Sequence, residues 1–143
     1  MKRFMLSLVA AASLFAGGSL FAQEAVVEAK VPFDFVVANS SLPAGTYRIG
    51  ACPSPLATQV TTVRNCDTGQ AVFNQSIPEH GQAQYPGKLV FYKYGDLYFL
   101  KEVHGPWAGT NVSVPESRRE KAARLEYATV RTWEEIIVPN EKQ

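Results

Sequence analysis

The sequence predicts a single all-β domain, an antiparallel sandwich or a partly open barrel of about seven strands, with one short helix near the C-terminus. Turn-forming residues recur at short intervals along the chain. The segments between them are rich in β-branched and aromatic side chains, which favour strands. Signals of a helix start occur in one region only, residues 113–117, so we expect one helix.

The first 22 residues have the pattern of a secretory signal peptide. Lys2 and Arg3 precede an apolar run over residues 4–16, and small residues lead to a cleavage position after Ala22. The apolar run is shorter than the ~20 residues that cross a bilayer. We therefore predict an exported protein, periplasmic or extracellular, with one domain over residues 23–143 and no transmembrane segment.

The charge balance argues against a polyanionic partner. The chain has 14 basic and 13 acidic residues, and removal of Lys2 and Arg3 with the signal peptide leaves 12 basic residues and a net charge near −1. The one basic cluster alternates with acidic residues, as is typical of a solvated helix face. It consists of Arg118, Arg119, Lys121 and Arg124 among Glu116, Glu120 and Glu126. We therefore predict no nucleic-acid partner.

The first half of the mature chain predicts four strands separated by turns. A polar turn containing proline and glycine covers residues 39–45. Pro53 and Pro55 end the following strand, because proline cannot donate to a strand ladder. A second turn over residues 66–69 makes a hairpin of the next two strands. The strands are predicted over residues 33–37, 47–51, 58–65 and 70–75.

A polar connector over residues 77–87 leads into the strongest hairpin signal. Residues 88–94 and 97–104 flank Gly95-Asp96, a two-residue loop of the kind that suits the primed turns. This loop sets Tyr94 opposite Leu97 and makes both faces apolar, so we expect the hairpin to be central in its sheet and covered on both sides. The predicted faces carry Val90, Tyr92, Tyr94, Leu97, Phe99 and Val103 on one side, and Leu89, Phe91, Tyr98 and Leu100 on the other.

The helix is predicted to begin at Ser117, which forms a capping-box pattern with Glu120, although Ser113 offers a second possible start. Glu120 precedes Arg124 by four residues, a spacing that favours an exposed ion pair. A last strand is predicted over residues 129–138. The apolar side chains of the helix are Ala122, Ala123, Leu125 and Ala128.

Three sequence blocks and one later motif carry a family resemblance. The blocks are residues 31–37 (VPFDFVV), 42–47 (LPAGTY) and 89–100 (LVFYKYGDLYFL), and the motif is Pro115-Glu116-Ser117-Arg118. In this order they resemble a group of short secreted proteins of unknown function common in acidobacterial genomes. The resemblance implies a bacterial, exported, single-domain protein. It implies no chemistry, because no activity is established for that group.

Cys52 and Cys66 could form a disulfide, since export places them where one persists. The bridge would close a loop of about 15 residues and stabilise the fold by roughly 3 kcal/mol. In a straight hairpin, however, the two cysteines lie near opposite ends of the strands. The bridge therefore requires residues 53–59 to fold back as a loop.

Asp67-Thr68-Gly69 matches the triplet of aspartic proteases, in which two such triplets bring together carboxylates that share a proton. The same three residues suit a hairpin turn, where Gly69 would supply a positive φ. Asn65 and Cys66 precede the triplet and are polar, whereas the proteases have apolar residues there. This difference favours the turn.

His80 and His104 are the only histidines, and a zinc site needs three or four organised ligands. Glu79 and Glu102 could complete such a site only if the connector folded against the hairpin. We expect both imidazoles to be exposed and unliganded, and we predict no metal and no cofactor. Three Asn-X-Ser patterns match the glycosylation acceptor and are expected to be unmodified in a bacterial host; they begin at Asn39, Asn74 and Asn111.

The aromatic side chains could line an apolar pocket, although a small β core uses the same residues. They include Tyr85, Tyr92, Tyr94, Tyr98, Trp107 and Tyr127. Our first hypothesis is a non-enzymatic exported domain that binds a protein or small molecule in the envelope or outside the cell. The second is a barrel carrier of a small apolar ligand bound by Phe33, Phe35, Tyr92 and Phe99. The third is a hydrolase that uses Asp67.

Overall fold

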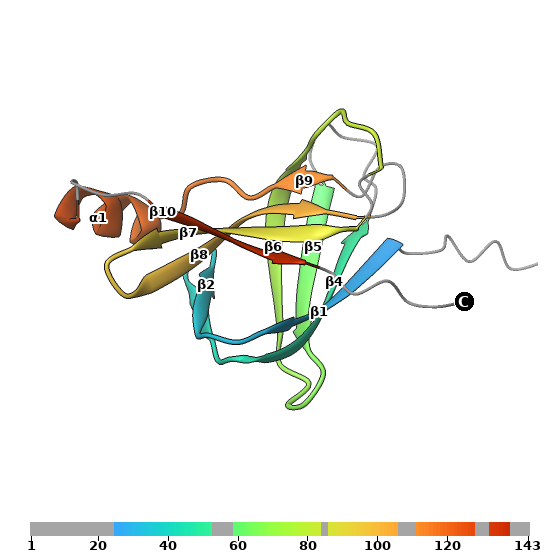
Figure 1. The fold of residues 1–143 in the computed structure, drawn as a ribbon, viewed down its shortest axis with the longest axis horizontal. Coiled ribbons are helices and arrows are strands. Elements are labelled where there is room, and N and C mark those ends of the chain that lie inside the picture. Colours follow the sequence, from blue (N-terminus) through green and yellow to red (C-terminus); the bar gives the residue numbers. More distant parts are fainter. Residues whose placement is uncertain (1–24, 53–58, 84–85, 106–110, 128–131, 138–143) are drawn as a thin grey trace, which may run out of the picture.

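The computed structural model shows a bent sheet with one short helix at its end (Figure 1). The structure describes residues 25–52, 59–83, 86–105, 111–127 and 132–137, so the predicted signal peptide, Tyr85 and Trp107 lie outside it. The described elements are β1 (Ala25–Val31), β2 (Phe35–Val37), β3 (Ser40–Leu42), β4 (Gly45–Cys52), β5 (Gln59–Asn65), β6 (Ala71–Pro78), β7 (Lys88–Tyr94), β8 (Leu97–His104), β9 (Val112–Ser113), α1 (Arg118–Glu126) and β10 (Thr132–Ile137).

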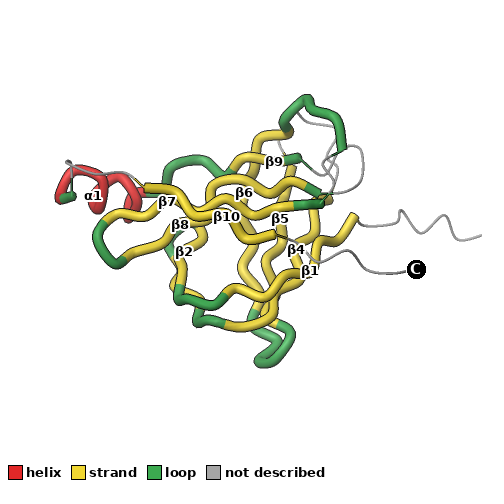
Figure 2. Tube along the Cα trace, viewed as in Figure 1, coloured by secondary structure: helices red, strands yellow, loops and turns green. Residues whose placement is uncertain are grey.

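The ten strands form one open sheet that is largely antiparallel. Its order is β1-β4-β5-β6-β9-β8-β2-β3, and β7 joins β8 to β10. In Figures 1 and 2 the strands β1, β4, β5 and β6 cross the direction of β7, β8 and β10. Strands β1 and β10 contact each other, but no strand pairing joins them in the described part of the chain. The sheet is therefore not a closed barrel.

The sequence predicted a β-rich domain with a C-terminal helix, and the structure confirms both, but it has ten strands where about seven were expected. The missed strands are β1, β3 and β9. Strands β3 and β9 are only three and two residues long, too short for a period of two to show. The prediction of a purely antiparallel sheet was also wrong, because β2 pairs in parallel with β8 at Val36 and Phe99. These residues are far apart in sequence, so no local pattern marks their pairing.

The main core lies on the concave side of the bent sheet, where alternate residues of neighbouring strands meet. Val27, Ile49, Val63 and Val72 stand opposite one another across β1, β4, β5 and β6. Phe35 packs edge-on against Tyr47 at 4.9 Å and against Phe91 at 5.3 Å, measured between ring centroids. The large buried members are Tyr47, Phe35, Phe91, Leu42, Leu89 and Leu100.

The β7–β8 hairpin has the predicted turn but not the predicted register throughout. Gly95 has a φ of +58° and Tyr94 stands opposite Leu97, as expected of a primed two-residue turn. Phe91 pairs with Leu100, whereas Val90 pairs with Glu102, so Lys101 is the extra residue of a β-bulge. The bulge moves Val103 to the face of Leu89 and into the main core. The prediction that placed Val103 beside Phe99 was therefore wrong.

Helix α1 begins where the first of the two predicted caps placed it. The Ser117 hydroxyl accepts a hydrogen bond from the Glu120 amide at 3.1 Å. Of the predicted apolar side chains, Ala123 is buried, but Leu125 is 64% exposed. Ala123 packs into a second, smaller cluster with Val36, Tyr94 and Phe99, on the opposite face of the hairpin from the main core. The hairpin is thus covered on both faces, as predicted.

The ion pairs of α1 differ from the expected one. Arg124 donates from Nε to Glu116 at 2.7 Å, which lowers the pKa of the Glu116 carboxyl. Glu120 instead turns inward and pairs with Lys101 Nζ at 3.0 Å, beneath the helix. The predicted Glu120–Arg124 pair was wrong because the bulge presents Lys101 to the helix. No helix in the described residues is long and apolar enough to cross a membrane.

Candidate functional site

A hollow of about 380 Å³ lies where β5 begins and β6 ends, a volume within the usual range for small-molecule sites. It is walled by the first residue of β5, the last residue of β6, the start of the connector and the residue before β9. Its lining residues are Gln59, Pro78, Glu79, His80, Gly81 and Asn111. Because β9 joins β6 to β8, the hollow lies beside the shortest link in the sheet.

Asn111 holds one wall of this hollow to the sheet. Its side chain is 3% exposed, and its Nδ2 donates to the carbonyl oxygen of Gln82 at 3.1 Å. Its backbone carbonyl oxygen accepts from the Glu79 amide at 2.9 Å. This bond fixes the orientation of the Asn111 amide, because a flipped amide would place Oδ1, an acceptor, against the Gln82 carbonyl oxygen, which is also an acceptor. In this orientation Oδ1 is buried and has no hydrogen-bond partner.

Gln59 also lines the hollow and has a second unpaired side-chain oxygen. Its Oε1 is buried without a hydrogen-bond partner, although its backbone carbonyl oxygen accepts from the Ser76 hydroxyl at 3.2 Å. The Ser76 hydroxyl also contacts that of Thr61 at 2.6 Å. A buried acceptor left without a donor costs roughly 1–3 kcal/mol. Two of the residues that line the hollow thus each have a buried amide oxygen without a hydrogen-bond partner.

The chemistry of the lining favours a ligand with hydrogen-bond donors. Glu79 and His80, which also line the hollow, are exposed. The Glu79 carboxylate adds two further acceptor oxygens and a negative charge to the two amide oxygens. Ammonium and guanidinium groups carry only donors and a positive charge, so they match this lining best.

The structure does not bring the four predicted ligand-binding aromatics together. Phe33 stacks on Tyr98 at a centroid distance of 3.9 Å and contacts Phe91, and Phe35 is also a main-core residue. Tyr92 and Phe99 belong to the smaller cluster under α1. The hairpin separates the two groups, so these contacts do not favour the apolar carrier, which stays a prediction.

The Asp67 triplet forms the β5–β6 turn, as the turn interpretation predicted. Gly69 has a φ of +75°. The backbone amides of Asp67 and Thr68 both donate to Asn65 Oδ1, at 2.8 and 2.9 Å. The Asp67 carboxylate accepts from the Thr46 amide at 3.4 Å. The side chain thus ties the turn to β4.

A buried polar network supports this turn from inside the sheet. Asn65 Nδ2 donates to the Tyr47 hydroxyl oxygen at 2.9 Å, and the hydroxyl donates to the Pro43 carbonyl oxygen. This four-residue reach back along the chain is that of a tyrosine corner. Burial raises the pKa of the Tyr47 phenol, which keeps it protonated as a donor. Asp34 accepts from the Ala44 amide at 2.9 Å and fixes the same corner.

The two histidines lie in different environments, and only His80 is exposed as expected. His104 is 7% exposed, and its Nε2 lies 2.8 Å from Glu102 Oε2. The prediction of an exposed His104 was wrong because the short β9 extends the sheet beside this end of β8. No group of three or more potential metal ligands occurs among the described residues.

The possible disulfide between Cys52 and Cys66 is not formed. Cys66 is a free, exposed cysteine, and its amide donates to the Thr46 carbonyl oxygen. Cys52 stands opposite Val60 at the other end of the β4–β5 ladder. Cys66 lies beside Thr46, and Cys52 is six positions further along the same strand, or about 20 Å away. A disulfide spans only ~7 Å between Cα atoms.

The Asn-X-Ser pattern at Asn111 has a structural role that the sequence did not reveal. Asn111 is buried, and its Nδ2, the atom that glycosylation would modify, donates to the Gln82 carbonyl oxygen in the connector. The sequence offered no signal for this role, because Asn111 meets the connector only through long-range packing. A search of protein-family models, curated proteins and solved structures finds no match to this chain.

Proposed function

We propose that this protein is an exported, non-enzymatic binding domain whose hollow beside Asn111 takes a small molecule through an ammonium or guanidinium group. The observation that carries the proposal is the buried, unpaired Oδ1 of Asn111, whose orientation is fixed by the bond from Nδ2 to Gln82. Export rests on the signal-peptide pattern at the N-terminus.

The acceptor set explains why a cation is preferred. Gln59 Oε1 and Asn111 Oδ1 are buried and unpaired, and Glu79 lines the same hollow. A guanidinium group presents several donors in one plane and can reach more than one acceptor at once. A neutral hydroxyl compound could satisfy the amide oxygens but would gain nothing from the charge of Glu79.

Calorimetric titration with agmatine tests this proposal, because agmatine carries a guanidinium and an ammonium group. We expect saturable binding that Gln59→Glu strengthens about fivefold to tenfold, since a carboxylate replaces a neutral acceptor next to the cation. The matched control is Gln70→Glu, in the exposed β5–β6 turn, which should leave the affinity unchanged. Equal strengthening by both variants, or no agmatine binding at all, would contradict the proposed cation site.

A further inference from the structure

The outward face of β5 and β6 carries three exposed apolar side chains. Phe73 and Ile77 point outward from β6 and are 69% and 52% exposed, and Val60 of β5 is 41% exposed. Val60 stands opposite Gln75, which lies between the other two on β6. The three side chains therefore form an apolar row on the convex side of the sheet, which Gln75 interrupts on β6.

Basic side chains lie beside this row on the same face. Arg48 of β4 stands directly opposite Arg64 of β5, an arrangement of like charges that destabilises a strand pair. Arg48 approaches Glu28 at 3.6 Å in an exposed pair. No ion pair joins Arg64 to another described residue. Lys30 of β1 adds a further outward basic group, and Glu28 is the one acidic residue among the described outward positions of β1, β4, β5 and β6.

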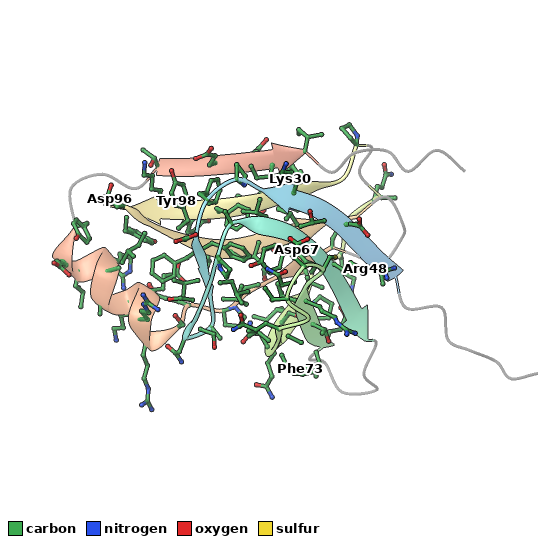
Figure 3. The ribbon with its side chains drawn as sticks, turned by 90° about the horizontal axis from the view of Figure 1, so that it is seen from below. Lys30, Arg48, Asp67, Phe73, Asp96 and Tyr98 are labelled. Atoms are coloured by element: carbon green, nitrogen blue, oxygen red, sulfur yellow. The ribbon has the colours of Figure 1, made fainter. Side chains whose placement is uncertain are left out.

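Figure 3 shows Phe73 and Arg48 on the outside of the molecule, away from its packed interior. In the strand register, Thr62 of β5 stands between Phe73 of β6 and Gly50 of β4. The next outward pair along β4 and β5 is Arg48 and Arg64, so the arginines lie close to Phe73. Exposed aromatic and aliphatic side chains beside paired arginines are complementary to a bilayer surface, where the apolar groups enter the headgroup boundary and the cations meet anionic headgroups.

We propose that this basic–apolar face, made of Val60, Phe73, Ile77, Arg48 and Arg64, docks on an anionic lipid surface. A second copy of the chain fits less well, because in a two-fold contact the matching face would offer the arginines only one described acidic residue, Glu28. An acidic polymer would engage the arginines but leave the apolar row without a role. The lipid surface uses both kinds of side chain, and it is independent of the hollow beside Asn111.

Co-sedimentation of the full chain with vesicles tests the proposal. Vesicles of phosphatidylcholine with 30% phosphatidylglycerol are the probe, and pure phosphatidylcholine vesicles are the comparison. We expect binding to the anionic vesicles only, weakening as salt is raised. Phe73→Ser should lower the partition coefficient about tenfold or more. Arg48→Gln and Arg64→Gln should each lower it about fivefold.

Matched controls lie on α1, at the other end of the molecule (Figure 1). Leu125 is 64% exposed and Arg118 is exposed, so Leu125→Ser and Arg118→Gln remove the same kinds of side chain elsewhere. Both should leave vesicle binding unchanged. Equal losses in the controls, equal binding to neutral vesicles, or no binding to either kind would overturn the proposal. Binding to hyaluronate without binding to vesicles would overturn it too, in favour of an acidic polymer.

Discussion

The two ends of β5 carry amide side chains that differ in how they are satisfied. At one end, Asn65 makes three side-chain hydrogen bonds, accepting from the amides of Asp67 and Thr68 and donating to Tyr47. At the other end, Gln59 Oε1 and the nearby Asn111 Oδ1 have none. Asn65 and Asn111 are similarly buried, at 1% and 3% exposure. The difference therefore reflects the neighbours that each side chain is given. It separates a structural site from the one that we propose binds a ligand.

The largest contrast is expected between two alanine substitutions. Asn65→Ala should lower the free energy of unfolding by about 3 kcal/mol, because it removes three hydrogen bonds. The Tyr47 hydroxyl and the two turn amides would then have no hydrogen-bond partner in place of Asn65. Asn111→Ala should cost only about 1 kcal/mol, because it removes one bond and also removes an unpaired buried oxygen. Urea unfolding of both variants measures the difference. Equal costs would mean that Asn111 is as fully satisfied as Asn65.

A smaller contrast of the same kind is expected between Tyr47→Phe and Gln59→Leu. Loss of the Tyr47 hydroxyl should cost about 1–2 kcal/mol, because it breaks the link between Asn65 and the Pro43 carbonyl. Gln59→Leu should be neutral or stabilise by up to about 1 kcal/mol, because an apolar group of similar size replaces an unpaired acceptor. The same variant should abolish agmatine binding. A destabilised Gln59→Leu protein would show that Oε1 has a partner within the fold.

The smallest effect is a pH dependence of stability at the buried Lys101–Glu120 pair. This pair is neither as fully hydrogen-bonded as Asn65 nor unpaired like Asn111 Oδ1. Burial raises the pKa of the Glu120 carboxyl, although the hydrogen bond from Lys101 opposes the shift. A raised carboxyl pKa means that the folded state binds the proton more tightly than the unfolded state. The wild-type protein should therefore gain stability relative to Glu120→Gln as the pH falls from neutral through the raised pKa to below the ordinary range of a glutamate. Unfolding curves of both proteins at neutral pH and in mild acid measure this, and a relative loss for the wild type would contradict it.

Local signals in the sequence predicted the elements that depend on neighbouring residues. Gly95-Asp96 gave the β7–β8 turn, and Ser117 gave the start of α1. The bulge at Lys101 could not be predicted in the same way, because both faces of the hairpin are apolar and a shift by one residue leaves the pattern acceptable. The bulge in turn decides which face Val103 takes and where Glu120 finds its partner.

The hollow was missed for a related reason. Asn111 lies in a polar segment that matched a glycosylation pattern, and its burial depends on Glu79 and Gln82, about 30 residues earlier in the chain. Gln59 stands at the first position of β5, where an exposed polar residue is ordinary. Nothing near either residue in sequence indicates a cavity. By contrast, the turn that holds Asp67 could be recognised, because Asn65, Asp67 and Gly69 are close together in the chain.

The most direct test of the account is an NMR titration that follows the side-chain amide protons of Asn65 and Asn111 while agmatine is added. The two groups are equally buried, so each serves as a control for the other. We predict that the Asn111 resonances shift in a saturable way and that the Asn65 resonances stay in place, since all of the hydrogen bonds of Asn65 are internal. Resonances of Asn111 that do not move, or that move only together with those of Asn65, would contradict the claim that its unpaired oxygen marks a binding site.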